Sequence, residues 1–118
     1  MQDLKKRYKQ FAIDTGELIQ QVPKSVINST YVNPLIRSSS SPGTNYRSAC
    51  RGKSMPDFIN KLKIVEEELD ESMYFFELLH HFNPDLRAPI DKLIKESEEL
   101  LSIIVSSIKT ARSKPRTS

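Results

Sequence analysis

The strongest helical signal in the chain lies in residues 54–82, SMPDFINKLKIVEEELDESMYFFELLHHF. Ser54 is followed by a proline and an aspartate, an order typical of a helix N-terminus with serine as the N-cap. Apolar side chains then return every three or four residues, at Phe58, Leu62, Val65, Leu69, Met73, Phe76 and Leu79. Further apolar residues widen the second half of this stripe, which predicts burial against more than one neighbour. Asn83-Pro84 ends the predicted helix.

Two more segments repeat the helical period. The first stripe comprises Leu4, Tyr8, Phe11, Thr15, Leu18 and Val22. Asp3 is placed to cap this helix and Pro23 to end it. From about Ala88, a heptad spacing joins Ile90, Ile94, Ser97, Leu101, Ile104, Ile108 and Ala111. Such spacing favours a bundle with shallow crossing angles.

The segment from Val26 to Arg51 is ambiguous. Its first part has helical spacing, but Pro34 interrupts it, and Arg37-Ser38-Ser39-Ser40-Ser41-Pro42-Gly43 has the composition of a loop. Composition alone therefore predicts two short helices joined by a serine-rich linker. Since no strand pattern competes, we predict an all-α fold, an antiparallel up-and-down four-helix bundle over residues 1–112. Residues 113–118 are predicted to form a flexible basic tail.

Length and composition limit the class of protein. The 118 residues fit one domain. Only 37% of them are apolar, which is low for a globular domain, and a subunit interface would compensate by covering more of the apolar surface. The single Cys50 excludes an internal disulfide, and no apolar run has the length of a membrane span. The N-terminus also lacks the apolar segment of a secretion signal, so we expect a cytoplasmic protein.

Charge is unevenly distributed along the chain. Residues 1–53 carry nine Lys and Arg against three Asp and Glu, whereas residues 54–118 carry nine against twelve. A basic excess of this kind attracts phosphates or complements a neighbouring subunit, although ordinary solvated helix faces are the alternative interpretation. The candidate nucleic-acid-binding residues are Lys5, Lys6, Arg7, Lys9, Arg47, Arg51 and Lys53. Exposed aromatic residues for base stacking are scarce, so we expect salt-sensitive contacts to the phosphate backbone.

No pattern predicts catalysis, a cofactor or a small-molecule substrate. Glu77 and His80 form a Glu-x-x-His step, but di-iron bundles need two such steps, and the only other histidine is the adjacent His81. The serines at 38–41 have no nearby base. We therefore expect no metal site and no enzyme. Glu67 and Glu71 share one helix face, where they are placed to meet Arg37, Arg47 or Arg51 across helices or subunits.

Residues 35–51, LIRSSSSPGTNYRSACR, resemble the signature of the bacterial four helix bundle protein family. The founding members of this family are encoded in intervening sequences of the 23S ribosomal RNA gene. Residues 57–79 resemble its second signature, and the match covers roughly residues 3–82. The motif residues at which the resemblance points to helix or subunit contacts are Arg37, Ser38, Asn45, Tyr46, Glu67, Asp70 and Glu71.

The resemblance implies an antiparallel four-helix bundle that assembles as a ring-like homopentamer. It also implies one bent helix through residues 37–50, but Pro34 and Pro42 replace the residues usual in relatives. We therefore expect this helix to be bent or broken near Ser38-Gly43. The family has no established enzymatic activity. A distant relative, the accessory protein of diversity-generating retroelements, is a basic pentamer that binds nucleic acid and a reverse transcriptase.

Two functions follow as expectations. The first is a non-enzymatic homo-oligomer that binds RNA or DNA, or a nucleic-acid enzyme, through a basic face. The second is a purely protein–protein scaffold whose charges serve subunit pairing. A metal-dependent enzyme is a distant third.

Overall fold

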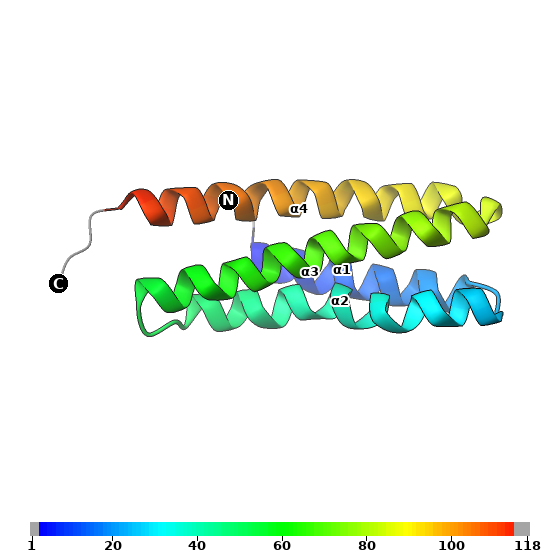
Figure 1. Cartoon of the computed structure of the whole chain (residues 1–118), viewed down its shortest axis with the longest axis horizontal. Coiled ribbons are helices and arrows are strands. Elements are labelled where there is room, and N and C mark those ends of the chain that lie inside the picture. Colours follow the sequence, from blue (N-terminus) through cyan, green and yellow to red (C-terminus); the bar gives the residue numbers. More distant parts are fainter. Residues whose placement is uncertain (1–2, 115–118) are drawn as a thin grey trace.

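The computed structural model describes residues 3–114, which form four long helices and one short 3₁₀ helix (Figure 1). The elements are α1 (Leu4–Gln21), α2 (Val26–Cys50), α3 (Met55–Phe82), η1 (Pro84–Leu86) and α4 (Arg87–Ser113). Consecutive helices run antiparallel and form an elongated body of 54 × 23 × 20 Å. The predicted all-α, up-and-down four-helix bundle is confirmed.

The starts of α1, α2 and α3 are set by side chains that accept hydrogen bonds from otherwise unpaired backbone N–H groups. Asp3 accepts from the backbone N–H of Lys6 at 3.3 Å, as expected for the N-cap of α1. Ser54 accepts from the N–H of Asp57 at 3.2 Å and caps α3. Ser25 caps α2 in the same way.

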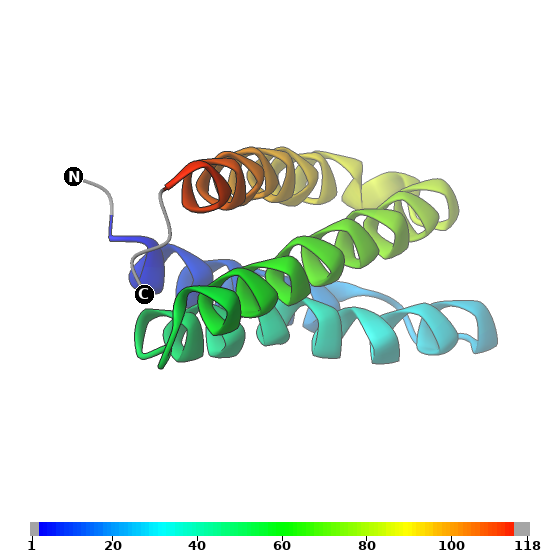
Figure 2. The ribbon, with the colours of Figure 1, turned by 60° about the vertical axis from the view of Figure 1, so that its left-hand side comes forward.

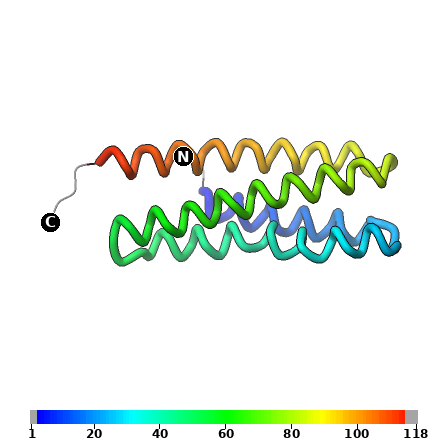
Figure 3. The backbone as a smooth tube through the Cα atoms, in the orientation of Figure 1, coloured from blue at the N-terminus to red at the C-terminus, as the bar shows by residue number. Residues whose placement is uncertain are grey.

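Helix α2 differs from the expectation. It runs as one helix from Val26 to Cys50, through both Pro34 and Pro42, and the tube in Figure 3 keeps its helical turns along this length. The predicted serine-rich linker is therefore wrong, and of the two outcomes expected near Ser38-Gly43, a bend or a break, the break does not occur. The hydroxyls of Ser38, Ser39 and Ser40 donate to helix carbonyls one turn earlier, so the serines bond within the helix instead of ending it.

Burial explains why α2 tolerates its two prolines. Leu35, Ser38, Ser39, Pro42 and Ala49 are all buried in the bundle. Each proline removes one helical hydrogen bond, but packing of the surrounding residues against α1 and α3 offsets that loss. Tertiary contacts therefore override the local tendency of this composition to form a loop.

The core is centred on α3, which lies between α2 and α4 (Figure 2). Its stripe is buried almost as predicted, and five side chains have no exposed surface: Leu62, Val65, Leu69, Phe76 and Leu79. Met73 is only half-buried, however, and Ser72 takes the buried position beside it. The Ser72 hydroxyl donates to Ser38 Oγ at 2.9 Å, so small side chains bring α2 and α3 close together.

The C-terminal boundary falls slightly later than predicted. Helix α4 includes Ser113, the first residue of the predicted tail, and Lys114 follows it. Residues 115–118 of that tail lie outside the described residues. None of the helices described between residues 3 and 114 combines the length and hydropathy needed to cross a bilayer.

The central position of α3 makes Leu69 a sensitive probe of the bundle. Because its side chain is fully buried, we expect Leu69→Ala to lower the free energy of unfolding by about 2–5 kcal/mol. Urea denaturation measures this as a lower midpoint with an unchanged slope. Ile64→Ala, on the same helix but 38% exposed, is the control and should change the midpoint much less. Equal losses from the two variants would contradict a core centred on α3.

Candidate nucleic-acid interface

A groove lies between the N-terminal half of α1 and the C-terminal half of α2. Its volume is about 450 Å³. The residues that line it, called the basic groove below, are Lys5, Lys6, Tyr8, Lys9, Ala12, Ser40, Gly43, Thr44, Arg47 and Arg51. Five of the seven predicted nucleic-acid-binding residues are among them.

Helical periodicity explains why these cations converge. Lys5 and Lys9 lie one turn apart on α1, and Arg47 and Arg51 lie one turn apart at the end of α2. Since the two helices are antiparallel neighbours, both pairs face the same groove. The helices approach closely at Gly43, where a Cβ would lie only 3.3 Å from the Cβ of Tyr8.

The groove is an uncompensated positive surface. Its lining contains no carboxylate, and none of its five Lys and Arg side chains has an ion-pair partner within residues 3–114. All five are solvent-exposed. Closely spaced, unpaired cations raise the local concentration of anions, phosphates above all.

The other two predicted residues lie elsewhere. Arg7 is on the opposite face of α1, where its Nε and Nη2 donate to Glu96 of α4 at 2.8 and 2.7 Å. Its Nη2 also lies 2.7 Å from Glu99, and the hydrogen bonds to Glu96 are the main reason why the pKa of Arg7 is raised. Lys53 lies in the connection between α2 and α3, outside the groove lining. Arg7 therefore joins α1 to α4 and is not available to the groove.

Several groove residues were not predicted. Ala12, Ser40, Gly43 and Thr44 form its small, uncharged floor and walls, but the sequence reading assigned Ser40 and Gly43 to a loop. The sequence feature that could have identified them is the spacing of four residues, about one helical turn, between Ser40 and Thr44 and between Gly43 and Arg47. That signal has meaning only if α2 is helical.

The residues of the family motif divide between two roles. Arg37 pairs with Glu68 at 3.1 Å and also with Glu71, both on α3 of the same chain. Ser38 accepts a hydrogen bond from Ser72, and the Tyr46 ring packs against that of Tyr8 with centroids 5.2 Å apart. These residues thus join helices within one chain.

Three other motif residues make no such contact. Among the residues that the structure describes, the Asn45 side-chain amide donates only to Ser41, within α2. Glu67 and Asp70 are exposed on α3, and neither has an ion-pair partner in the described part of the chain. Their carboxylates are free to meet another molecule.

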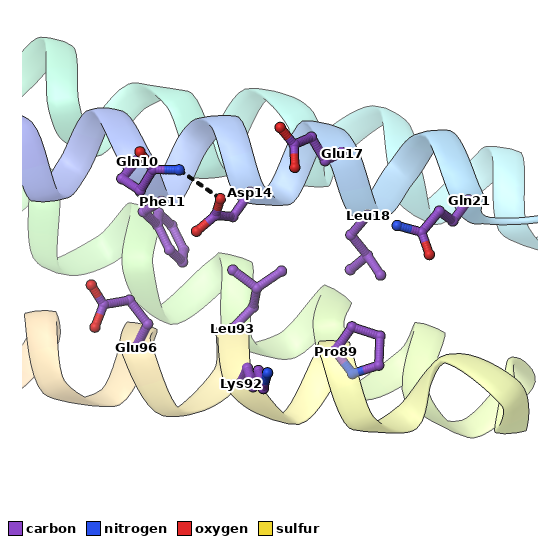
Figure 4. Close-up of a pocket in the computed structure, with 10 residues that line it drawn as sticks. All are labelled: Gln10, Phe11, Asp14, Glu17, Leu18, Gln21, Pro89, Lys92, Leu93 and Glu96. Carbon is purple, nitrogen blue, oxygen red and sulfur yellow. Dashed lines mark hydrogen bonds between the residues drawn. The ribbon is translucent and has the colours of Figure 1, made fainter.

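A second hollow, of about 340 Å³, lies between α1 and α4 (Figure 4). Core residues form its floor, including Phe11, Leu18 and Leu93, and its rim mixes acidic, amide and basic groups. Gln10 donates to Asp14 across part of this rim at 2.7 Å. No single type of charge dominates, so this hollow lacks the clear ligand preference of the basic groove.

The possible metal-binding step does not form a cluster. His80 Nε2 lies 3.1 Å from Asp91 Oδ1 of α4, while Glu77 is exposed. Across residues 3–114, no three His, Cys, Asp or Glu side chains gather as metal ligands would.

Comparison with known proteins agrees with the fold. The structure belongs to the class of antiparallel four-helix bundle proteins. It is similar to the crystal structure of a protein of unknown function from the S23 ribosomal protein family of Bacteroides thetaiotaomicron. The two are 29% identical with a TM-score of 0.81, over 91% of this chain and 99% of that one. The family resemblance seen in the sequence is thereby confirmed. No family model and no curated protein matches the chain.

Tyr8, beneath the groove, gives a test of the local packing. Its side chain is 1% exposed, and within residues 3–114 its hydroxyl has no hydrogen-bond partner. An unpaired buried hydroxyl is costly, so we expect Tyr8→Phe to raise the free energy of unfolding at pH 7 by about 1 kcal/mol. Urea denaturation measures this, with the exposed Tyr74→Phe as the control. A less stable Tyr8→Phe protein would contradict the unpaired hydroxyl.

The same variant should respond differently to alkali. Burial raises the pKa of Tyr8 in the folded state, whereas the unfolded chain releases this proton near pH 10. The unfolded state therefore binds fewer protons above about pH 10, and the free energy of unfolding falls as pH rises. Burial likewise raises the pKa of Tyr46 to about 12. In Tyr8→Phe the fall above pH 10 should be shallower, because the contribution of Tyr8 is lost while that of Tyr46 remains.

Proposed function

We propose that this chain is a non-enzymatic, homo-oligomeric helical bundle of the cytoplasm that binds RNA or DNA through phosphate contacts in the basic groove. One observation carries the proposal. Five exposed cations surround one groove whose lining contains no carboxylate, and none of them has an ion-pair partner within residues 3–114. A polyanion is the ligand that such a surface favours.

The groove favours contacts to the backbone over contacts to bases. Its one aromatic lining residue, Tyr8, is buried and offers no ring for stacking. Lysine and arginine contacts to phosphate set position and affinity but carry little sequence information. We therefore propose binding that depends on salt and only weakly on base sequence.

Removing the groove cations tests the proposal directly. We expect Lys9→Ala/Arg47→Ala/Arg51→Ala to weaken binding of a labelled RNA at least tenfold in 50 mM salt, because the variant loses three phosphate contacts. Fluorescence anisotropy measures the affinity. The control, Lys63→Ala/Lys95→Ala/Lys109→Ala, removes the same charge at exposed sites outside the groove. Equal losses in both triple variants would point to net charge alone, and no binding by the unaltered protein would overturn the proposal.

Self-association has separate support on the opposite side of α2. Four rings form an aromatic patch, in which Tyr74 and Phe82 are exposed and Tyr31 and Phe75 are half-buried, with neighbouring centroids 5.5–6.3 Å apart. Tyr74 is 58% exposed and Phe82 44%. Interfaces are enriched in aromatic residues, so we propose this patch as a contact between copies of the chain. The resemblance to the family makes the expected assembly a pentamer.

Light scattering tests the proposed assembly. We expect Tyr74→Ser/Phe82→Ser to reduce the mass of the particle, since it removes apolar area from the contact. Ile13→Ser on α1 and Val105→Ser on α4, each at a 42% exposed site, are the controls and should keep the mass. A monomeric unaltered protein would overturn the proposal.

The scaffold alternative makes the opposite prediction for the groove variants. If the groove cations serve subunit pairing, Lys9→Ala/Arg47→Ala/Arg51→Ala changes the mass and no RNA binding exists to be lost. The exposed, unpaired Glu67 and Asp70 on α3 are the observation that favours this alternative.

A further inference from the structure

We infer that the basic groove takes the sugar–phosphate backbone of a single strand in preference to a duplex. This inference rests on the proposed function and adds the form of nucleic acid that the site selects. Three features of the groove support it: the spacing of its cations, its width and the chemistry of its floor.

The cations are spaced to follow one strand. Lys5 and Lys9 on one wall, and Arg47 and Arg51 on the other, are each separated by four residues. Four residues of helix rise about 6 Å, which is comparable with the distance between successive phosphates of an extended strand. Two such pairs on facing walls can therefore contact neighbouring phosphates of the same strand from both sides.

A groove between two neighbouring helices is too narrow to seat a duplex on its floor. The walls are adjacent helices, and packed helix axes lie about 8–10 Å apart. A duplex is broader than this, because its major groove alone is about 12 Å wide. A duplex can touch only the cations on the rim, whereas a single strand can enter the hollow of about 450 Å³.

The floor is suited to a strand held without base recognition. Ala12 and Gly43 add no polar side-chain group, and the Ser40 hydroxyl already donates to the Ile36 carbonyl at 2.8 Å. The Thr44 hydroxyl lies 3.5 Å from the Ser40 carbonyl in the same role. Since these protons are engaged within α2, the long Lys and Arg side chains supply the ligand contacts. Single strands of different sequence should therefore bind alike.

The first experiment compares single-stranded and duplex DNA by fluorescence anisotropy with the full chain. The probes are a labelled oligo-dT, a single strand of mixed sequence, and a hairpin duplex with the same number of phosphates. At 50 mM salt we expect both single strands to bind at least tenfold more tightly than the hairpin. The logarithm of the binding constant should fall with the logarithm of salt at a slope of about −3 if four phosphates are neutralised.

The second experiment fills the groove without changing its charge. We expect Ser40→Leu/Thr44→Leu to weaken single-strand binding about tenfold and to leave hairpin binding unchanged, because only a strand on the floor meets the added side chains. Both positions are exposed on α2, and the control, Ser102→Leu/Ser106→Leu, makes the same replacements at exposed positions of α4. Circular dichroism checks that the helices persist. Should the double variant unfold, Thr44→Leu alone is measured in its place.

The outcomes separate this inference from the proposed function. Equal or tighter binding of the hairpin, or unchanged single-strand binding by the filled groove, overturns the single-strand inference but leaves nucleic-acid binding in place. Failure of all three probes to bind overturns both.

Discussion

Burial of one stripe of α3 between α2 and α4 is the constraint on which the rest of the structure depends. Leu62, Leu69 and Phe76 lie along this stripe with no exposed surface. Close approach of α2 requires small side chains opposite, which the Ser38–Ser72 contact provides. Since α2 must stay helical to keep this contact, its prolines and serines are accommodated within the helix. The same packing places the C-terminal half of α2 where α1 can form the second wall of the groove.

Periodicity was enough to predict α1, α3 and α4, because each has an apolar stripe, and α1 and α3 also have a side chain that caps the N-terminus. It was not enough for α2. Four consecutive serines followed by Pro42-Gly43 are typical of a loop, and nothing local shows that Ser38, Ser39 and Pro42 will be buried. Their burial depends on residues more than thirty positions away, such as Ser72. Only the family resemblance pointed to a helix here. The two prolines do not break that helix, because the residues around them are packed inside the bundle.

The candidate site could be predicted only as far as helical periodicity shows which charged residues share a helix face. Lys5 and Lys9 share a face, while Arg7, two residues from each, points to the other side of α1 and pairs with Glu96. Periodicity alone would have separated Arg7 from the other cations. The carboxylates that pair with Arg37 could not be predicted, because they depend on how α3 packs against α2. In the structure Glu68 and Glu71 face α2 and Glu67 does not. The floor of the groove was beyond reach, because it depends on the helical state of residues 40–44.

The distribution of ion pairs gives the charge asymmetry of the chain its physical meaning. Residues 1–53 carry nine Lys and Arg, of which Arg7 and Arg37 pair with carboxylates of α4 and α3. These two contacts use Glu96, Glu99, Glu68 and Glu71 to join helices, whereas no carboxylate lines the basic groove. Cations held close together without counter-charges repel one another, so this arrangement opposes folding. If the same lysines and arginines were spread over α1 and α2, they would repel one another less and the net charge of the protein would be unchanged. A fold that concentrates them around one groove therefore supports a role for the groove in binding an anion, because the bound anion removes the repulsion.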